Sequence, residues 1–152
     1  MLRKTALPAL LLLLVACSDK PEPIFFGEDN CSYCRMQISD VRYGGELITN
    51  KGKAYKFDSA ECMTAYILKN HKGSDDTKSL WVIDFKNPEN LTDAKSAVYL
   101  HSEKLGSPMG MNLTAFANLN DAEIVAKEYS GEIIRWDDVK NIVSEKWLTK
   151  EH

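Results

Sequence analysis

The sequence has 152 residues, with 19 basic and 22 acidic side chains and a formal net charge of −3 at neutral pH. A polybasic membrane patch or a nucleic-acid footprint needs a surplus of Lys and Arg, so this balance excludes both. The length suits one domain, or two small lobes that share a core.

Residues 1–16 are predicted to be a signal peptide. Arg3 and Lys4 precede a small and apolar run, Ala6 to Ala16, which is too short to span a bilayer because a span needs about 20 such residues. The run ends in Leu14-Val15-Ala16-Cys17, which matches a lipobox. We therefore expect an envelope lipoprotein that faces the periplasm and contacts the membrane only through a lipid on Cys17. Residues 17–28 are predicted to form the lipidated tether, and residues 29–152 the folded domain.

The first half of the domain predicts a loop, a hairpin, a helix and a strand. The polar segment 29–36 lacks periodicity and is expected to be a loop. Strands 46–49 and 54–57 are predicted to join through Asn50-Lys51-Gly52. Asp58-x-x-Glu61 fits a capping box, so Asp58 is expected to cap a helix that ends near Asn70. Residues 80–85 form the next predicted strand.

The second half predicts the same order of elements. Strands 97–100 and 112–117 flank a loop at 106–111, Asn120-x-x-Glu123 is expected to open a helix, and residues 132–135 form another strand. An amphipathic helix follows, with one apolar face made by Val139, Ile142, Val143 and Trp147. The predicted fold class is α+β: two β-β-α-β units forming one small domain, plus a C-terminal helix.

Three cysteines remain besides Cys17, namely Cys31, Cys34 and Cys62. In an oxidising compartment an odd number cannot pair fully, so at least one must stay a thiol, bind a metal or react. Cys62 falls in the first turn of the predicted helix, where a half-buried small side chain is expected rather than a ligand.

Two pairs of sulfur-containing residues are each separated by a single residue. Cys34 and Met36 would project to the same side of an extended segment, and Met109 and Met111 repeat the spacing on a loop. Thiolate and thioether together select Cu(I), whereas zinc prefers thiolate and imidazole. The methionines could instead fill the core, but two pairs at matching places favour a Cu(I) site. His101 is expected to be a solvated histidine at a strand end.

Other interpretations of the cysteines stay open. Cys31-x-x-Cys34 has the spacing of a catalytic dithiol, although the residues after it are poor helix formers. A structural zinc site could use the cysteines with His71 or His101, but a second C-x-x-C is missing from the sequence. A disulfide from Cys31 or Cys34 to Cys62 is a further alternative.

An ordered set of short motifs resembles the NosL family of nitrous oxide reductase accessory lipoproteins. The resemblance covers roughly residues 29–126. Its pieces, beyond the lipobox, are Tyr33-Cys34-Arg35-Met36, Tyr55-Lys56-Phe57-Asp58, Ala97-Val98-Tyr99, Ser107-Pro108-Met109-Gly110 and Thr114-Ala115-Phe116. Arg35 stands where many members have glycine, and Cys31 is not shared by all of them.

The resemblance implies a membrane-tethered, non-enzymatic Cu(I) chaperone with Cys34, Met36 and Met109 as the metal ligands. Such a chaperone supplies the copper-sulfide centre of nitrous oxide reductase during denitrification, and works with an ABC-transporter maturation complex. The implied fold is two β-β-α-β units, similar to part of organomercurial lyase. The alternative is a periplasmic thiol enzyme that uses Cys31 and Cys34, either a thiol-disulfide oxidoreductase or an organomercurial-lyase-like protein with Cys34 as nucleophile.

Overall fold

The computed structural model describes residues 20–70 and 76–149. The expected signal peptide, the lipidated Cys17 and His71 lie outside the described residues. Within the described residues, every helix is too short or too polar to cross a membrane.

The first unit is built around the expected hairpin, which is confirmed. Strand β1 (Gly45–Thr49) pairs antiparallel with β2 (Ala54–Phe57) on one side and with β3 (Thr77–Asp84) on the other. Helix α1 (Ala60–Asn70) connects β2 to β3 and ends where the sequence predicted. An additional strand, β4 (Asn87–Asp93), pairs with β3 and completes a sheet of order β2-β1-β3-β4.

The second unit repeats this arrangement, so the prediction of two β-β-α-β units is confirmed. Strand β5 (Val98–His101) lies between β6 (Leu113–Phe116) and β7 (Glu132–Ile134), giving the order β6-β5-β7. Helix α2 (Leu119–Tyr129) connects β6 to β7. In both units the first strand is therefore central. The chain continues into α3 (Trp136–Val143) and a π-helical turn, η1 (Ser144–Leu148).

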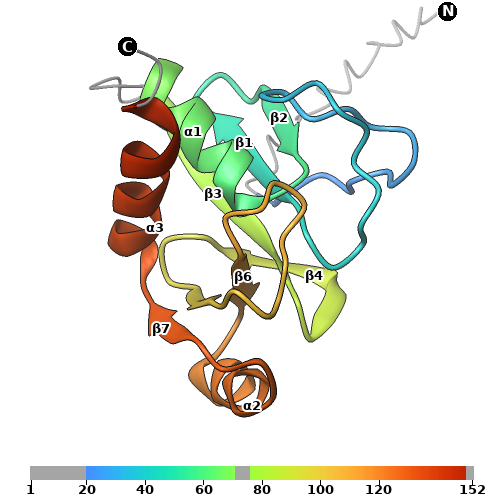
Figure 1. The fold of residues 1–152 in the computed structure, drawn as a ribbon. Coiled ribbons are helices and arrows are strands. Elements are labelled where there is room, and N and C mark those ends of the chain that lie inside the picture. Colours follow the sequence, from blue (N-terminus) through green and yellow to red (C-terminus); the bar gives the residue numbers. More distant parts are fainter. Residues whose placement is uncertain (1–19, 71–75, 150–152) are drawn as a thin grey trace, which may run out of the picture.

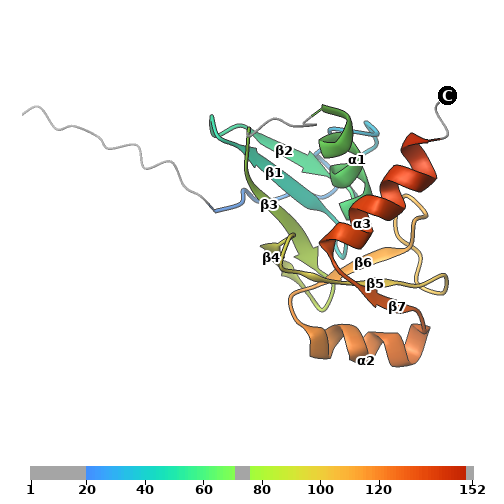
Figure 2. The same ribbon diagram turned by 90° about the vertical axis from the view of Figure 1, so that its left-hand side faces the viewer.

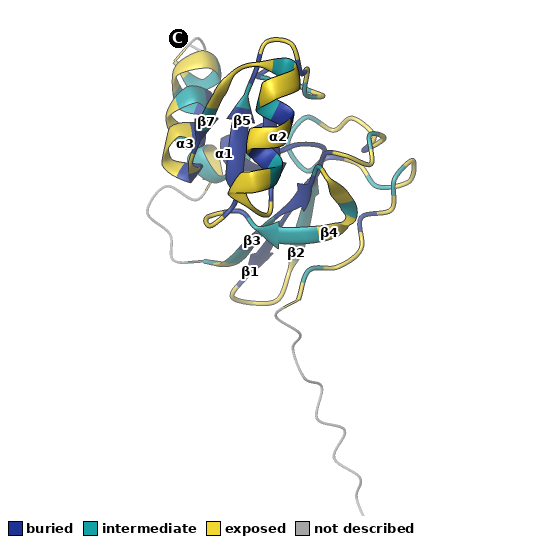
Figure 3. Ribbon diagram, turned by 90° about the horizontal axis from the view of Figure 1, so that it is seen from below, coloured by how far each residue is buried: buried dark blue, intermediate teal, exposed yellow. Residues whose placement is uncertain are grey.

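The helices occupy different positions around the two sheets. Helix α2 lies along the outer side of the β5-β6-β7 sheet, whereas α3 lies on the opposite side, next to α1 (Figures 1 and 2). Strands β1, β5 and β6 are buried, whereas β4 is not, and α2 and α3 expose their outer faces to solvent (Figure 3). The main core lies between the sheets, α1 and α3, with Leu47, Phe57, Met63, Tyr99 and Val139 among its fully buried residues.

Hydrogen bonds join the two units. The Phe85 N–H after β3 donates to the carbonyl of Ala115 on β6 over 3.0 Å. The buried Tyr43 hydroxyl donates to the carbonyl of Gly106 over 3.0 Å, and lies 3.2 Å from the Thr114 hydroxyl. The loop before β1 is therefore fixed to the loop before β6.

Both predicted helix caps are wrong by one or two residues. Ser59, not Asp58, precedes α1, and its hydroxyl accepts from the Cys62 N–H over 3.3 Å. Asn118, not Asn120, caps α2 and accepts from the Asp121 N–H. In each case the nearer side chain reaches the free amides of the first turn, which is what a cap requires. The error leaves Asp58 free for another contact.

Candidate metal centre

The loop that carries Cys31 and Cys34 is a closed turn fixed to the first sheet. The Cys31 N–H donates to the carbonyl of Met36 over 2.8 Å, and the Arg35 N–H donates to the carbonyl of Cys31 over 3.0 Å. The Ser32 N–H donates to the carbonyl of Lys56 on β2 over 2.8 Å. These backbone bonds hold both cysteines against the end of β2, where α1 begins.

The expectation that Cys34 and Met36 lie in an extended segment is wrong. Arg35 between them has a φ of 68°, in the left-handed region that favours glycine. The chain therefore turns between the two side chains. Cys34 is half-buried and points into the molecule's thiol cluster, whereas Met36 is 54 % exposed.

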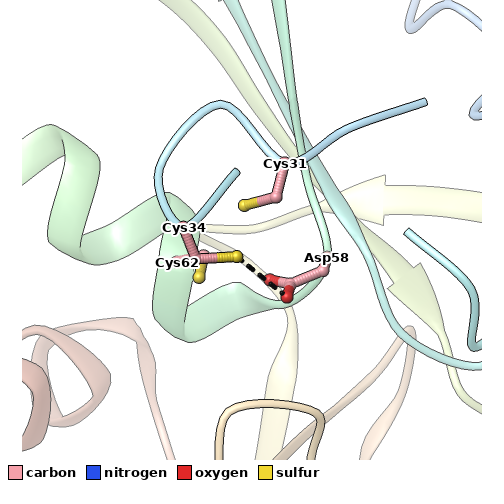
Figure 4. A group of neighbouring side chains, drawn as sticks. All are labelled: Cys31, Cys34, Asp58 and Cys62. Atoms are coloured by element: carbon pink, nitrogen blue, oxygen red, sulfur yellow. Dashed lines mark hydrogen bonds between the residues drawn. The ribbon is translucent and has the colours of Figure 1, made fainter. Parts of the chain in front are cut away.

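Three sulfurs and one carboxylate meet at the start of α1. The ligand atoms of Cys31, Cys34, Asp58 and Cys62 all lie within 4.8 Å of one another. Figure 4 shows the first two cysteines on the loop, Asp58 just after β2, and Cys62 on α1. Cys31 and Cys62 have no solvent exposure, and all three cysteines are free thiols. The expectation of a half-buried Cys62 is therefore wrong.

Asp58 contacts this cluster directly because Ser59 has taken the capping position. Its Oδ2 accepts a hydrogen bond from the Cys34 thiol over 3.3 Å, and its Oδ1 accepts from the Ser59 hydroxyl over 3.2 Å. Asp58 is itself buried, with 4 % exposure. Its carboxylate therefore orients Cys34 and borders the sulfurs.

The cluster favours one thiolate among three thiols. The pKa of Cys31 falls to about 6, chiefly because the Cys62 thiol donates a hydrogen bond to its sulfur. The pKa of Cys62 rises for the same reason, since that bond holds its proton. Burial raises the pKa of Cys34 to about 12. A thiolate with two thiols beside it is a soft donor set for a thiophilic metal ion.

The loop before β6 is held against the same end of α1. The Ser107 hydroxyl donates to Oε1 of the buried Glu61, and the Leu113 N–H donates to the same oxygen over 3.4 Å. The Asn112 N–H donates in turn to the Ser107 hydroxyl over 2.8 Å. Because Glu61 is the neighbour of Cys62, these bonds fix residues 107–113 beside the thiol cluster.

A hollow of about 240 Å³ separates the two loops. Its lining residues come from the segment after Cys34, from Asp58 and from the residue before Met109: Met36, Gln37, Ser39, Asp40, Asp58 and Pro108. The exposed Met36 and the loop of the second unit thus border one hollow, with Asp58, a member of the thiol cluster, at its wall.

The other predicted or considered ligands have distinct positions. Met109 is half-buried and packs at the edge of the main core, as Cys34 does. Met111 is 2 % exposed and belongs to that core. His101 lines a different hollow, with residues 102–104 and 129–132, and its Nε2 lies 3.5 Å from Nζ of Lys146. In the thiol cluster the fourth member is Asp58, not a histidine.

The family model described as NosL matches residues 25–143. The chain belongs to the NosL family. A curated relative, the copper-binding lipoprotein NosL of Stutzerimonas stutzeri, is 28 % identical over 163 residues, which covers 97 % of this chain and 85 % of the relative. The resemblance drawn from the short motifs is therefore confirmed.

The fold is also that of a solved member of the NosL family. The crystal structure of the copper chaperone NosL from Shewanella denitrificans superposes with a TM-score of 0.67. It shares 22 % identity and covers 80 % of this chain and 96 % of the other. At this identity the match supports the α+β fold, which is confirmed.

The predicted copper ligands include one member of this cluster, Cys34, and leave out Cys31, Asp58 and Cys62. The zinc alternative grouped the three cysteines, but with a histidine in place of Asp58. Asp58 was assigned as the helix cap and Cys62 as packing. The available signal was that Cys62 and Ser59 are three residues apart, the spacing of a cap and its bonded amide. If Ser59 is assigned as the cap, Asp58 is no longer needed at the helix start and is available for another contact. Cys62 then lies in the first turn of α1, which is buried.

Proposed function

We propose that this chain is a lipid-anchored, periplasm-facing Cu(I) carrier that delivers copper for the copper-sulfide centre of nitrous oxide reductase. Its partners in this proposal are the reductase or its ABC-transporter maturation complex, and the anchor is the lipid on Cys17. Membership of the family and the copper-binding relatives support a carrier. The observation that carries the proposal is that Met36 and Pro108, the residue before Met109, line one hollow together with Asp58, which accepts a hydrogen bond from the Cys34 thiol.

Cys34, Met36 and Met109 suit a site that must both hold and release Cu(I). One thiolate offsets the cost of desolvating the ion, and two thioethers add soft, neutral and weakly held contacts. The hollow leaves Met36 exposed, so an incoming ligand can reach the metal before the old ones leave. Such a site favours transfer over permanent storage.

The thiol-enzyme alternative has weaker support. In an oxidoreductase the attacking cysteine of a C-x-x-C motif opens a helix, whose N-terminus lowers the cysteine's pKa. Here residues 32–34 form a turn, and the first cysteine of the motif, Cys31, has a lowered pKa but no solvent exposure. The accessible thiol is Cys34, and its raised pKa lowers the thiolate fraction that a nucleophile needs.

Anaerobic Cu(I) titration of the detergent-solubilised protein against a competing chelator tests the proposal. Cys34→Ser should nearly abolish Cu(I) binding at this site because the anionic ligand is lost. Met36→Leu and Met109→Leu should each weaken Cu(I) binding at this site about tenfold, which corresponds to about 1.4 kcal/mol, while the fold is kept because Leu fills a similar volume. The matched control is Met111→Leu, in the core, which should leave binding unchanged.

Two results would contradict the proposal at different levels. If Met109→Leu leaves Cu(I) binding unchanged, also in the Met111→Leu background, the site does not span the two loops. If the loaded protein does not raise the copper content of apo-nitrous oxide reductase in the presence of its transporter complex, the delivery step is wrong although copper is bound.

A further inference from the structure

The proposed Cu(I) site of Cys34, Met36 and Met109, called the exposed site below, uses one of the three clustered thiols. It gives no role to the other two, Cys31 and Cys62. Cys31 and Cys62 have no solvent exposure, yet their sulfurs lie within 4.8 Å of that of Cys34 (Figure 4). A cysteine that only fills a core needs no sulfur neighbours. Three free thiols at this distance have a spacing close to that of ligands around one ion.

We propose that Cys31, Cys34 and Cys62 bind a second Cu(I), behind the exposed one, with Cys34 as the ligand shared by both ions. The protein then carries two Cu(I) per chain. This inference rests on the proposed function and deepens it, because it adds an inner position to the same site. Binding replaces S–H bonds by copper–sulfur bonds, and the thiol protons pass to solvent.

The distances fit three sulfurs around one ion. Metal–thiolate bonds of about 2.3 Å place three ligand sulfurs roughly 4 Å apart. The observed sulfurs, within 4.8 Å of one another, therefore need to approach by less than about 1 Å. Cys34, on a turn and partly exposed, is the member best placed to make this movement and to face both ions.

The surroundings offset the negative charge that thiolates bring into a buried site. Cys62 lies in the first turn of α1, near the positive end of the helix dipole. Two Cu(I) ions on three thiolates also leave a smaller net charge than one ion would, which lowers the cost of burial.

Cu(I) fits this inner position better than Zn(II). Three sulfurs complete the coordination that Cu(I) accepts, whereas zinc takes four ligands and would need Asp58 as the fourth. One oxygen of Asp58 accepts from the Ser59 hydroxyl, and the other accepts from Cys34 only while that thiol keeps its proton. Cu(I) needs no ligand from Asp58, whereas four-ligand Zn(II) would require its second oxygen, so the two metals give different coordination.

The stoichiometry of Cu(I) binding tests the proposal. The wild-type protein should take up two equivalents in anaerobic titration, and Cys31→Ser and Cys62→Ser should each take up one. The double variant Met36→Leu/Met109→Leu should also retain one equivalent, held by the inner thiols. X-ray absorption of the wild-type protein should show a copper–copper scattering path at two equivalents and none at one equivalent.

Several outcomes would overturn the inner site. One equivalent in the wild type, with no effect of Cys31→Ser or Cys62→Ser, would remove it while leaving the proposed carrier intact. Absence of Cu(I) binding would remove both. Preferential, four-ligand Zn(II) binding would replace it by a structural zinc site. Cys62→Ala, which keeps an apolar side chain, and the wild-type absorption spectrum give the answer even if the serine variants do not fold.

Discussion

Helices α1 and α2 occupy the same place in the two units but have very different environments. Each has 11 residues and connects the second strand of its unit to the third. Six consecutive residues at the start of α1 are buried, whereas α2 buries Ala122 and Val125. Helix α1 packs against β1, β2, β6, α3 and η1, while α2 packs against its own sheet.

The comparison shows how one copy of a repeated unit acquires a binding site. The loop before β6 covers the start of α1 through the Ser107–Glu61 hydrogen bond. The turn of α1 that carries Cys62 is therefore buried. The start of α2 has no such cover, and Leu119 there is 44 % exposed. All members of the thiol cluster belong to the first unit, and the second unit contributes the contact that covers the start of α1.

The largest contrast is expected from truncating one apolar residue in each helix. Met63 on α1 is fully buried, so Met63→Ala should lower the free energy of unfolding by about 2–5 kcal/mol. The matched change on α2 is Ile124→Ala, at a side chain that is 46 % exposed, and it should cost less than about 1 kcal/mol. Urea unfolding measures both, and equal effects would refute the contrast.

The second prediction concerns the buried carboxyl group of Glu61. Burial raises its pKa, and Oε2 finds no hydrogen-bond partner in the described part of the chain. A raised pKa in the folded state means that this group's contribution to stability is fully present below its unfolded pKa, and is lost as the pH rises toward its folded pKa.

Glu61→Gln should therefore remove part of the pH dependence of unfolding. The neutral amide keeps an oxygen for Ser107, so the variant should match the wild type near pH 4. At pH 8 it should be more stable, by about 1–3 kcal/mol, the range for a buried polar group left without a partner. Urea unfolding at several pH values between 4 and 8 measures the stability of both proteins. If the two stabilities change with pH in parallel, the pKa of Glu61 is not raised.

The smallest effects are expected in the two loops that face each other. Arg35 and Asn112 both have left-handed backbones, with φ of 68° and 61°. A left-handed conformation costs most L residues roughly 1–2 kcal/mol, but asparagine tolerates it. Arg35→Gly should thus stabilise the protein by up to about 1 kcal/mol, and Asn112→Gly should change it by a few tenths. Thermal unfolding of both variants tests this difference: the midpoint temperature should rise more for Arg35→Gly than for Asn112→Gly.

Much of the fold was predictable because it depends on local signals. The Asn50-Lys51-Gly52 turn located the first hairpin, and the apolar spacing before Asn70 located α1. Strand β4 was not predicted, because Asn87-Pro88-Glu89-Asn90 has little strand propensity. It forms through pairing with the edge of β3, an interaction that the sequence of the segment does not reveal.

The candidate site was less predictable because it depends on contacts between distant residues. The grouping of Cys62 with Cys31 requires knowledge of how α1 packs against the first loop. Similarly, Met109 and Met111 are equivalent in sequence, and only the packing separates the core residue from the one at the edge. The ligand role of Cys34, Met36 and Met109 stays a prediction.

The attachment of the N-terminal segment limits where the protein can work. The Glu22 N–H donates to both carboxylate oxygens of Glu46 on β1, over 2.9 and 3.1 Å, and Ile24 is buried. Cys17, the proposed lipid attachment, is five residues from Glu22. Five residues span at most roughly 17 Å at about 3.5 Å per residue. Under the proposed function the metal centre would therefore be held close to the bilayer, and a client would have to approach the membrane surface to receive copper.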